Sequence, residues 1–129
     1  MPQEIRDGWA ERLLNELELL RSAETFADLY DRLQSLRIKF VGPLTVYDTA
    51  FRIGAKLGLE PELVYLHRGT LAGAVLLGFS KRPHLKMEEL PSAFQGLRPY
   101  EVEDCLCIYK KDIKRIVRFM GLPGKSARG

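Results

Sequence analysis

The stretch Phe40–Leu59, which reads FVGPLTVYDTAFRIGAKLGL, places a Gly-Pro turn directly before the most strongly patterned helix that the sequence predicts. Pro43 has a φ fixed near helical values and lacks a backbone N–H, so it fits the first position of a helix, with Gly42 as the cap before it. Gly58 suits the left-handed position that commonly ends a helix. The sequence therefore predicts a helix that begins at Pro43 and ends near Gly58.

The residues of this expected helix divide into two faces. Apolar and small residues recur at helical spacing and predict a core-facing stripe of Leu44, Tyr47, Ala50, Phe51, Gly54 and Leu57. The other side carries the polar residues Thr45, Asp48, Thr49, Arg52 and Lys56. We expect the first face to pack and the second to meet solvent or a ligand. Because Asp48 and Arg52 are four residues apart, we also expect a surface ion pair between them.

The segment Val41–Val46 resembles the second half of the helix-hairpin-helix motif of DNA-binding modules, whose pattern is Gly-h-Gly-Pro-x-Thr-Ala with h apolar. Phe40 stands where the motif has its first glycine, and Val46 stands where it has alanine. The resemblance implies that backbone N–H groups of the hairpin and the positive end of the second helix hold a DNA phosphate. It also implies a fold with a helix-hairpin-helix-like centre.

The overlapping segment Asp48–Leu59 resembles the region around the catalytic aspartate of endonuclease-III-type DNA glycosylases. Asp48 is one residue closer to the Phe-Arg pair than in that family, the histidine after Asp-Thr is missing, and the hairpin lacks the catalytic lysine. We therefore assign no catalytic residue. A degenerate glycosylase-like enzyme is kept as a third functional alternative.

A chain of 129 residues with 46% hydrophobic content is expected to form one globular domain. Helical periods recur in nearly every segment, so the predicted fold is all-α, a single compact bundle of about five to seven helices over residues 1–121. Residues 122–129 are expected to be a disordered basic tail. The core is predicted to include Leu13, Leu17, Leu33, Tyr47, Phe51, Leu57, Leu76, Leu106 and Ile113.

Five further expectations concern individual elements. Residues 5–20 should form one amphipathic helix, and Ser22 or Thr25 should cap the helix that follows. A short helix is predicted through Leu63, Val64 and Leu66, and Thr70 is expected to cap the next one. A final helix should begin near Pro99 and continue with an apolar seam of Val102, Leu106, Tyr109, Ile113, Ile116 and Met120.

Cysteine and histidine usage indicates no metal site or cofactor. Cys105 and Cys107 are two residues apart on an expected helix, where their side chains diverge by about 200°, so no disulfide is expected between them. His67 and His84 are distant from them in the sequence and complete no metal-binding spacing. A signal peptide or long apolar run is not evident, which predicts a cytoplasmic protein that does not enter a membrane.

Charge is distributed unevenly along the chain. The net formal charge is −4 over residues 1–35, +5 over residues 36–86 and +6 from Lys110 to the end. Such basic blocks favour a polyanionic partner. Together with the hairpin resemblance, they predict a small non-catalytic DNA-binding protein that contacts the phosphate backbone with little sequence preference. The residues expected to bind DNA are Lys39, Gly42, Thr45, Arg52, Lys56, Lys110, Lys114 and Arg118.

A second function class fits the same sequence. The acidic N-terminal helix or the final helix with its heptad-like seam could dock a protein partner or a second copy of the chain. In that case the protein is an adaptor or a homodimeric interaction module. Salt-dependent binding to duplex DNA distinguishes the two classes.

Overall fold

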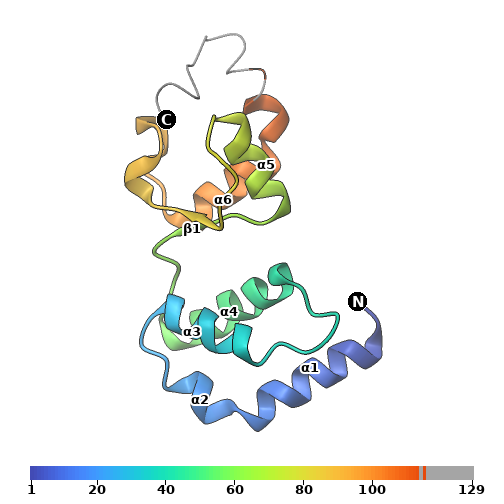
Figure 1. Ribbon diagram of the computed structural model, residues 1–129. Helices are drawn as coiled ribbons and strands as arrows, with labels where there is room; N and C mark the ends of the chain where they lie inside the picture. The colour runs from blue at the N-terminus through green and yellow to red at the C-terminus, as the bar shows by residue number, and fades with distance from the viewer. Residues whose placement is uncertain (114, 116–129) are drawn as a thin grey trace. The chain divides into compact units, whose positions relative to one another are not determined.

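The structure is a computed structural model that describes residues 1–113 and 115. The described residues are mostly helical (Figure 1), which confirms the all-α fold class. The chain forms two compact units, Met1–Pro61 and Glu62–Gly129, whereas the sequence predicts one domain over residues 1–121. We call them the N-terminal and C-terminal units and describe each by itself. The predicted tail lies outside the described residues.

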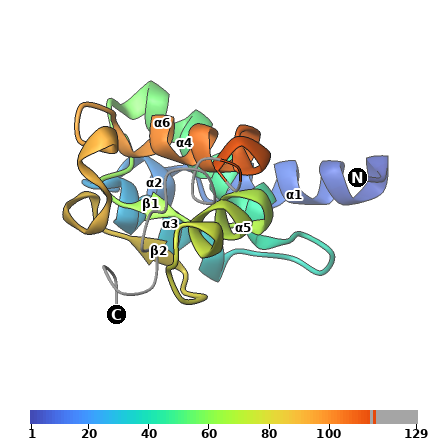
Figure 2. The same ribbon diagram turned by 90° about the horizontal axis from the view of Figure 1, so that it is seen from above.

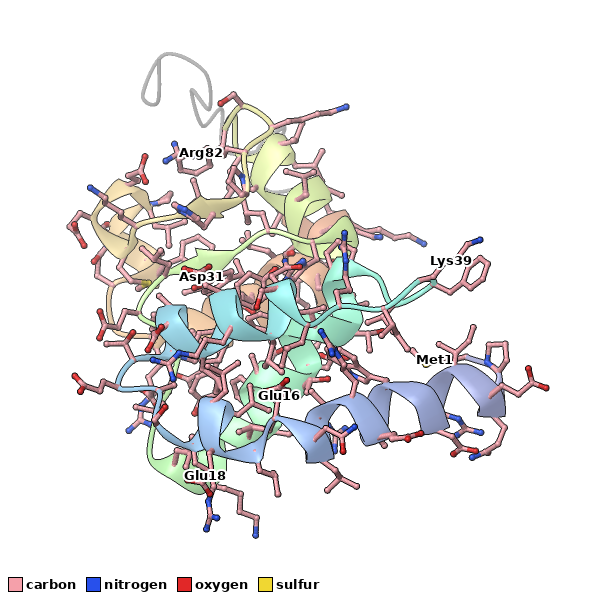
Figure 3. All side chains as sticks on the ribbon, turned by 60° about the horizontal axis from the view of Figure 1, so that its bottom comes forward. Met1, Glu16, Glu18, Asp31, Lys39 and Arg82 are labelled. Carbon is pink, nitrogen blue, oxygen red and sulfur yellow. The ribbon has the colours of Figure 1, made fainter. Side chains whose placement is uncertain are left out.

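The N-terminal unit contains helices α1 (Gln3–Asn15), α2 (Leu17–Arg21), α3 (Phe26–Ser35) and α4 (Pro43–Leu57). The single helix expected over residues 5–20 is wrong, because the chain leaves helical geometry at Glu16, with φ −122° and ψ 28°. Figure 3 labels Glu16 at this break. The break changes which residues face inward: Leu20 is buried, Leu13 is half-buried, and Leu17 is exposed rather than part of the core.

The expected ends of α3 and α4 are largely confirmed. Thr25, not Ser22, caps α3, since its hydroxyl accepts a hydrogen bond from the Asp28 N–H at 3.0 Å. Helix α4 begins at Pro43 with Gly42 as its N-cap. It ends at Gly58, whose φ of 74° is the left-handed conformation that glycine adopts without a steric cost.

Helices α3 and α4 pack together mainly through large apolar side chains. The Phe26 ring lies 5.7 Å from the Tyr47 ring in an edge-on arrangement. Tyr47 also approaches the rings of Tyr30 and Phe51, at 6.3 and 6.2 Å between centroids. Aromatic pairs at these distances add to the free energy of burial. This aromatic cluster therefore holds the two helices against each other.

The buried face of α4 differs from the predicted stripe. Val46, Tyr47, Ala50 and Gly54 are buried, Phe51 and Leu57 are only half-buried, and Leu44 is 49% exposed. The prediction for Leu44 is wrong because Val46, about 200° further round the helix, faces the core instead. Leu44 and Val46 are both apolar and both lie in the first turn of α4. The apolar pattern therefore does not show which of the two is buried.

The C-terminal unit contains strands β1 (Val64–Tyr65) and β2 (His84–Leu85), helices α5 (Arg68–Leu76) and α6 (Pro99–Ile108), and 3₁₀ turns η1 (Met87–Glu89) and η2 (Ser92–Phe94). β1 and β2 pair antiparallel, as Figure 2 shows from above. The short helix predicted through Leu63, Val64 and Leu66 is therefore wrong. Val64, Tyr65 and Leu66 are buried in succession, which suits an extended segment rather than one face of a helix.

Helix α5 begins earlier than expected. His67 is its N-cap, and Thr70 lies within its first turn, where the Thr70 hydroxyl accepts the His67 N–H at 2.6 Å. The prediction that Thr70 is the cap is thus wrong, although Thr70 does bond to the capping residue. Leu106, as predicted, belongs to the core of this unit, and Leu76 packs against that core while only partly buried.

Helices α5 and α6 approach each other at two glycines. A Cβ atom at Gly73 would collide with the backbone of Leu106, and one at Gly69 would lie 2.5 Å from Cys107 Sγ. Gly69 and Gly73 are four residues apart, so both lie on the same face of α5. The small residues on this face of α5 therefore allow the close packing. The two helices meet backbone to backbone at Gly73, and at Gly69 the backbone of α5 meets the small side chain of Cys107.

The final helix is not continuous. α6 ends at Ile108, and Tyr109 has φ −101° and ψ 20° before helical geometry resumes at Lys110. Tyr109 is 53% exposed, so its predicted place in the apolar seam is wrong, while Ile113 is buried as predicted. Ile116 and Met120, which the prediction also placed in this seam, lie outside the described residues.

Candidate nucleic-acid interface

The turn between α3 and α4 contains a residue in an uncommon backbone conformation. The Val41 N–H donates to the Ile38 carbonyl at 3.2 Å and closes a tight turn with Lys39 and Phe40 at its centre. Phe40 has φ 70°, and among the described residues it is the single non-glycine with positive φ. Turns that need positive φ at their third residue usually have glycine there. Phe40 thus adopts a glycine-like conformation at the position where the helix-hairpin-helix pattern has glycine.

Helix α4 begins immediately after this turn and leaves the donors of its first turn open. No side chain caps the helix at Gly42, and its first turn contains no acidic residue. Helix α3 differs, because Thr25 caps it and Asp28 lies in its first turn. The first N–H groups of a helix have no partner within the helix and carry partial positive charge. The start of α4 can therefore accept an anion, whereas α3 already has its own acceptors.

Cationic and polar residues predicted to bind DNA lie around this turn. Lys39 is exposed, and its Nζ lies 5.2 Å from the centroid of the Phe40 ring. Figure 3 shows Lys39 projecting from the far end of the turn. Thr45 is half-buried at the start of α4. Lys39, Gly42 and Thr45 are thus brought together by the structure.

Arg52 and Lys56 are exposed further along α4. Because they follow Thr45 by seven and eleven residues, they lie on nearly the same side of the helix. The eleven-residue separation corresponds to about 16 Å along the helix axis. Arg52 and Lys56 therefore do not lie at the turn itself. They form a basic surface that continues from the turn along α4.

The polar face of α4 is partly covered. The Trp9 indole N–H donates to the Thr49 hydroxyl at 3.1 Å, and Thr49 in turn donates to the Thr45 carbonyl at 2.7 Å. Helix α1 thus packs over Thr49, and the expectation that this whole face is free for solvent or a ligand is wrong at this residue. The contact joins residues forty positions apart, so no local pattern in the sequence could reveal it.

The expected ion pair between Asp48 and Arg52 is absent. Within the described part of the chain, the ion pairs join Arg21 to Glu18, Arg32 to Asp28 and Arg82 to Glu89. Asp48 and Arg52 are both exposed, and Arg52 is not held by its neighbour. A guanidinium without a protein carboxylate is available to an external anion.

The predicted cations of the last helix belong to the C-terminal unit. Lys110 is exposed, whereas Lys114 and Arg118 lie outside the described residues. Lys110 and Lys111 border a groove of about 520 Å³ whose other lining residues are Leu71, Ala72, Val75, Leu76 and Lys81. Lys110 therefore lies beside apolar side chains that the sequence had not associated with it.

Sequence reasoning missed two features. A hollow of about 560 Å³ beside the α3–α4 turn is lined by Met1, Pro2, Ile5, Phe40 and Thr45. In the C-terminal unit, the buried Glu103 carboxylate accepts the Tyr65 N–H at 3.0 Å and ties β1 to α6. Both features join residues more than thirty positions apart, and no motif at either end signals them.

Two further properties concern the described residues. No three His, Cys, Asp or Glu side chains among residues 1–113 and 115 gather as a metal ion would require. No helix in the same residues has the length and apolar character needed to cross a membrane.

Comparisons of this chain with protein-family models, with curated proteins and with solved structures find no match. The helix-hairpin-helix resemblance therefore depends on the residues of the turn and on their geometry alone.

Proposed function

We propose that the N-terminal unit is a non-catalytic DNA-binding module that holds the phosphate backbone at the α3–α4 turn with little sequence preference. The observation that carries the proposal is the start of α4, which follows a glycine-like turn residue and has neither a side-chain cap nor an acidic residue in its first turn. A phosphate oxygen there would accept hydrogen bonds from the open backbone N–H groups, and the helix dipole would favour the negative charge of the phosphate. Such contacts recognise the backbone and not the bases.

Basic side chains near the start of α4 support the same binding site for the DNA backbone. Lys39 lies at the turn, and Arg52 and Lys56 continue along α4 without an ion pair to any carboxylate of residues 1–113 and 115. Each phosphate neutralised releases counterions, so affinity should fall with salt with a log–log slope of about −0.9 per phosphate. We expect measurable binding of the intact chain to a short duplex at low salt. No binding by the folded protein under these conditions would refute the proposal.

Gly42→Val tests close approach of a phosphate to the turn. Apart from Gly42 itself and its two chain neighbours, no described residue has an atom within 4 Å of a Cβ added at Gly42, and the backbone there is extended, so the fold should tolerate the change. The added side chain would instead obstruct a phosphate at the helix start. We expect weaker duplex binding with little change in stability. Gly96→Val is the matched control, because Gly96 also has open space around it and lies in the other unit.

Charge substitutions test the two sets of cations separately. Lys39→Gln with Arg52→Gln and Lys56→Gln should flatten the salt dependence, while Lys86→Gln, an exposed control, should leave it unchanged. The same measurement on Lys110→Gln with Lys114→Gln and Arg118→Gln shows whether the C-terminal cations also contact DNA. Unchanged salt dependence in both multiple variants would contradict a phosphate-backbone mode.

The proposal assigns no catalysis to this site. Asp48, the residue that resembles a catalytic aspartate, is exposed on α4, and the turn provides no lysine at the family's position. We expect the purified protein neither to excise bases nor to nick abasic DNA. Turnover that disappears in Asp48→Asn would overturn this part of the proposal and favour the enzyme alternative.

A protein-binding function is the second candidate, and the groove on the C-terminal unit is the observation that favours it. Leu71, Val75 and Leu76 provide an apolar floor, and the bordering side chains Lys81, Lys110 and Lys111 are all cationic. This combination is complementary to an amphipathic helix with acidic flanks. Val75→Glu should abolish such binding without affecting duplex DNA, which separates the two candidates.

A further inference from the structure

The side chain of Phe40 is unusually accessible for a phenylalanine. It is 74% exposed, although it belongs to a turn between two well-packed helices. The Lys39 ammonium lies over its ring, 5.2 Å from the centroid. Residues 36–47 contain two cations and no acidic residue. An exposed aromatic face is thus presented in a locally positive environment.

The same ring borders the hollow next to the turn. Met1, Pro2 and Ile5 of the N-terminal segment also line it, together with Thr45 from the first turn of α4. The volume of about 560 Å³ is more than one planar ring needs. A ligand that enters the hollow can therefore contact the Phe40 ring while an attached anionic group reaches the start of the helix.

We propose that this hollow receives an unpaired nucleobase, which stacks on Phe40 while the adjoining phosphate is held at the start of α4. The proposal rests on the proposed function and deepens it by naming the form of DNA. Aromatic rings stack on bases of any sequence, and positive side chains follow the backbone of single strands. In a continuous duplex each base is already stacked on its neighbours, so the ring has no base face to contact. The protein should therefore prefer single-stranded or gapped DNA to intact duplex.

The first experiment compares binding of the intact chain to three probes at the same low salt. The probes are an oligo-dT single strand, a blunt duplex, and the same duplex with a one-nucleotide gap opposite an unpaired 2-aminopurine. One stacked base is expected to give about tenfold tighter binding to the single strand and the gapped duplex than to the blunt duplex. Stacking on Phe40 should also quench 2-aminopurine fluorescence on binding.

Substitutions at Phe40 separate the ring from the turn. Phe40→Gly removes the ring and supplies the residue that suits the positive φ, so the turn is retained. It should reduce affinity for the gapped probe to the level of the blunt duplex, leave duplex binding within about twofold, and abolish the quenching. Phe40→Trp keeps an aromatic face and should keep the preference. Leu14→Ala removes an exposed apolar side chain away from the hollow and serves as the control.

The outcomes distinguish this inference from the proposed function. Equal binding to all three probes, unaffected by Phe40→Gly, would overturn base stacking but leave phosphate-backbone binding supported. An equal loss for blunt and gapped duplex in Phe40→Gly would also overturn it, because the ring would then contact the backbone. Failure of the folded protein to bind any probe would overturn both proposals.

Discussion

The helix pairs α3–α4 and α5–α6 pack by opposite means. Between α3 and α4 the space is filled by aromatic side chains, with Phe26 edge-on to Tyr47. Between α5 and α6 the backbones themselves approach, because Gly69 and Gly73 have no side chains to separate them. The α3–α4 interface depends on large side chains, whereas the α5–α6 interface depends on the absence of side chains. Truncation should therefore damage one unit and enlargement the other.

The largest expected effect on stability comes from removing a buried side chain of the N-terminal unit. Phe26 is 2% exposed, so Phe26→Ala should lower the free energy of unfolding by about 3–5 kcal/mol. Urea denaturation followed by Trp9 fluorescence measures it, since this single tryptophan is buried in the same unit. Phe51→Ala is the comparison. The sequence predicts the same loss if the Phe51 ring is buried, but the ring is half-buried, so its removal should lower the free energy of unfolding by less. Equal losses would contradict the observed packing.

Enlargement in the C-terminal unit is the next largest effect. Gly73→Ala forces a methyl group against the backbone of Leu106, and overpacking of this kind costs about 1–3 kcal/mol. Gly69→Ala is the matched change one turn away, where the group that must move is the Cys107 side chain. A thiol can rotate, so its cost should be smaller. Circular dichroism during thermal unfolding compares the two, and a more stable Gly73→Ala variant would contradict the close approach.

The sequence predicted those features of the two pairs that depend on local chemistry. Pro43, Gly42 and Gly58 determine the ends of α4 because proline and glycine restrict or permit particular backbone angles. The buried side of α4 was harder to predict, because helical spacing alone does not decide whether Leu44 or Val46 is buried, and the structure buries Val46.

The candidate site was predictable to a similar extent. The pattern of the turn predicted Gly42 as the cap of α4, and the structure confirms it. That Lys39, Gly42 and Thr45 bind DNA stays a prediction. The sequence treated Phe40 as a departure from a glycine pattern, and only coordinates show its positive φ and its exposed ring. The covering of Thr49 by Trp9 and the hollow lined by Ile5 arise from contacts between distant segments, which periodicity does not encode.

The residues that lead into the second helix of each pair give a smaller test. Phe40, two residues before the N-cap of α4, has φ 70°, whereas His67, the N-cap of α5, is extended with φ −109°. A left-handed conformation costs an L-residue roughly 1–2 kcal/mol, and glycine avoids this cost. Glycine also makes the unfolded chain more flexible, which lowers the free energy of unfolding by about 0.4–1 kcal/mol. Phe40→Gly should therefore stabilise the N-terminal unit by up to about 1 kcal/mol, measured by urea denaturation. Phe40→Ala keeps the strained φ, and greater stability of this control than of Phe40→Gly would disprove the strain.

The smallest expected effects are pH dependences of opposite sign in the two units. In the C-terminal unit, the hydrogen bond from the Lys86 N–H lowers the pKa of Glu89 most, burial acts in the opposite direction, and the hydrogen bond and charge of Arg82 lower the pKa further. A lowered folded-state pKa gives stability that is present above the ordinary value of 4.5 and is lost as pH falls through the lowered one. Because this carboxylate is partly exposed, the loss should stay below about 1 kcal/mol. Glu89→Gln should remove this acid dependence.

In the N-terminal unit, burial raises the pKa of Tyr30 above its ordinary value of 10.0, with the Gln34 hydrogen bond acting in the opposite direction. A raised folded-state pKa gives stability that is fully present below pH 10 and is lost as pH rises through the raised value. Ionisation of Tyr30 should therefore weaken the aromatic pair α3–α4 in alkali, and protonation of Glu89 should weaken the C-terminal unit in acid. Urea denaturation of Tyr30→Phe at pH 8 and at pH 10.5, followed by Trp9 fluorescence, checks the alkaline part. If the variant loses as much stability as the wild-type protein between these pH values, ionisation of Tyr30 is not the cause.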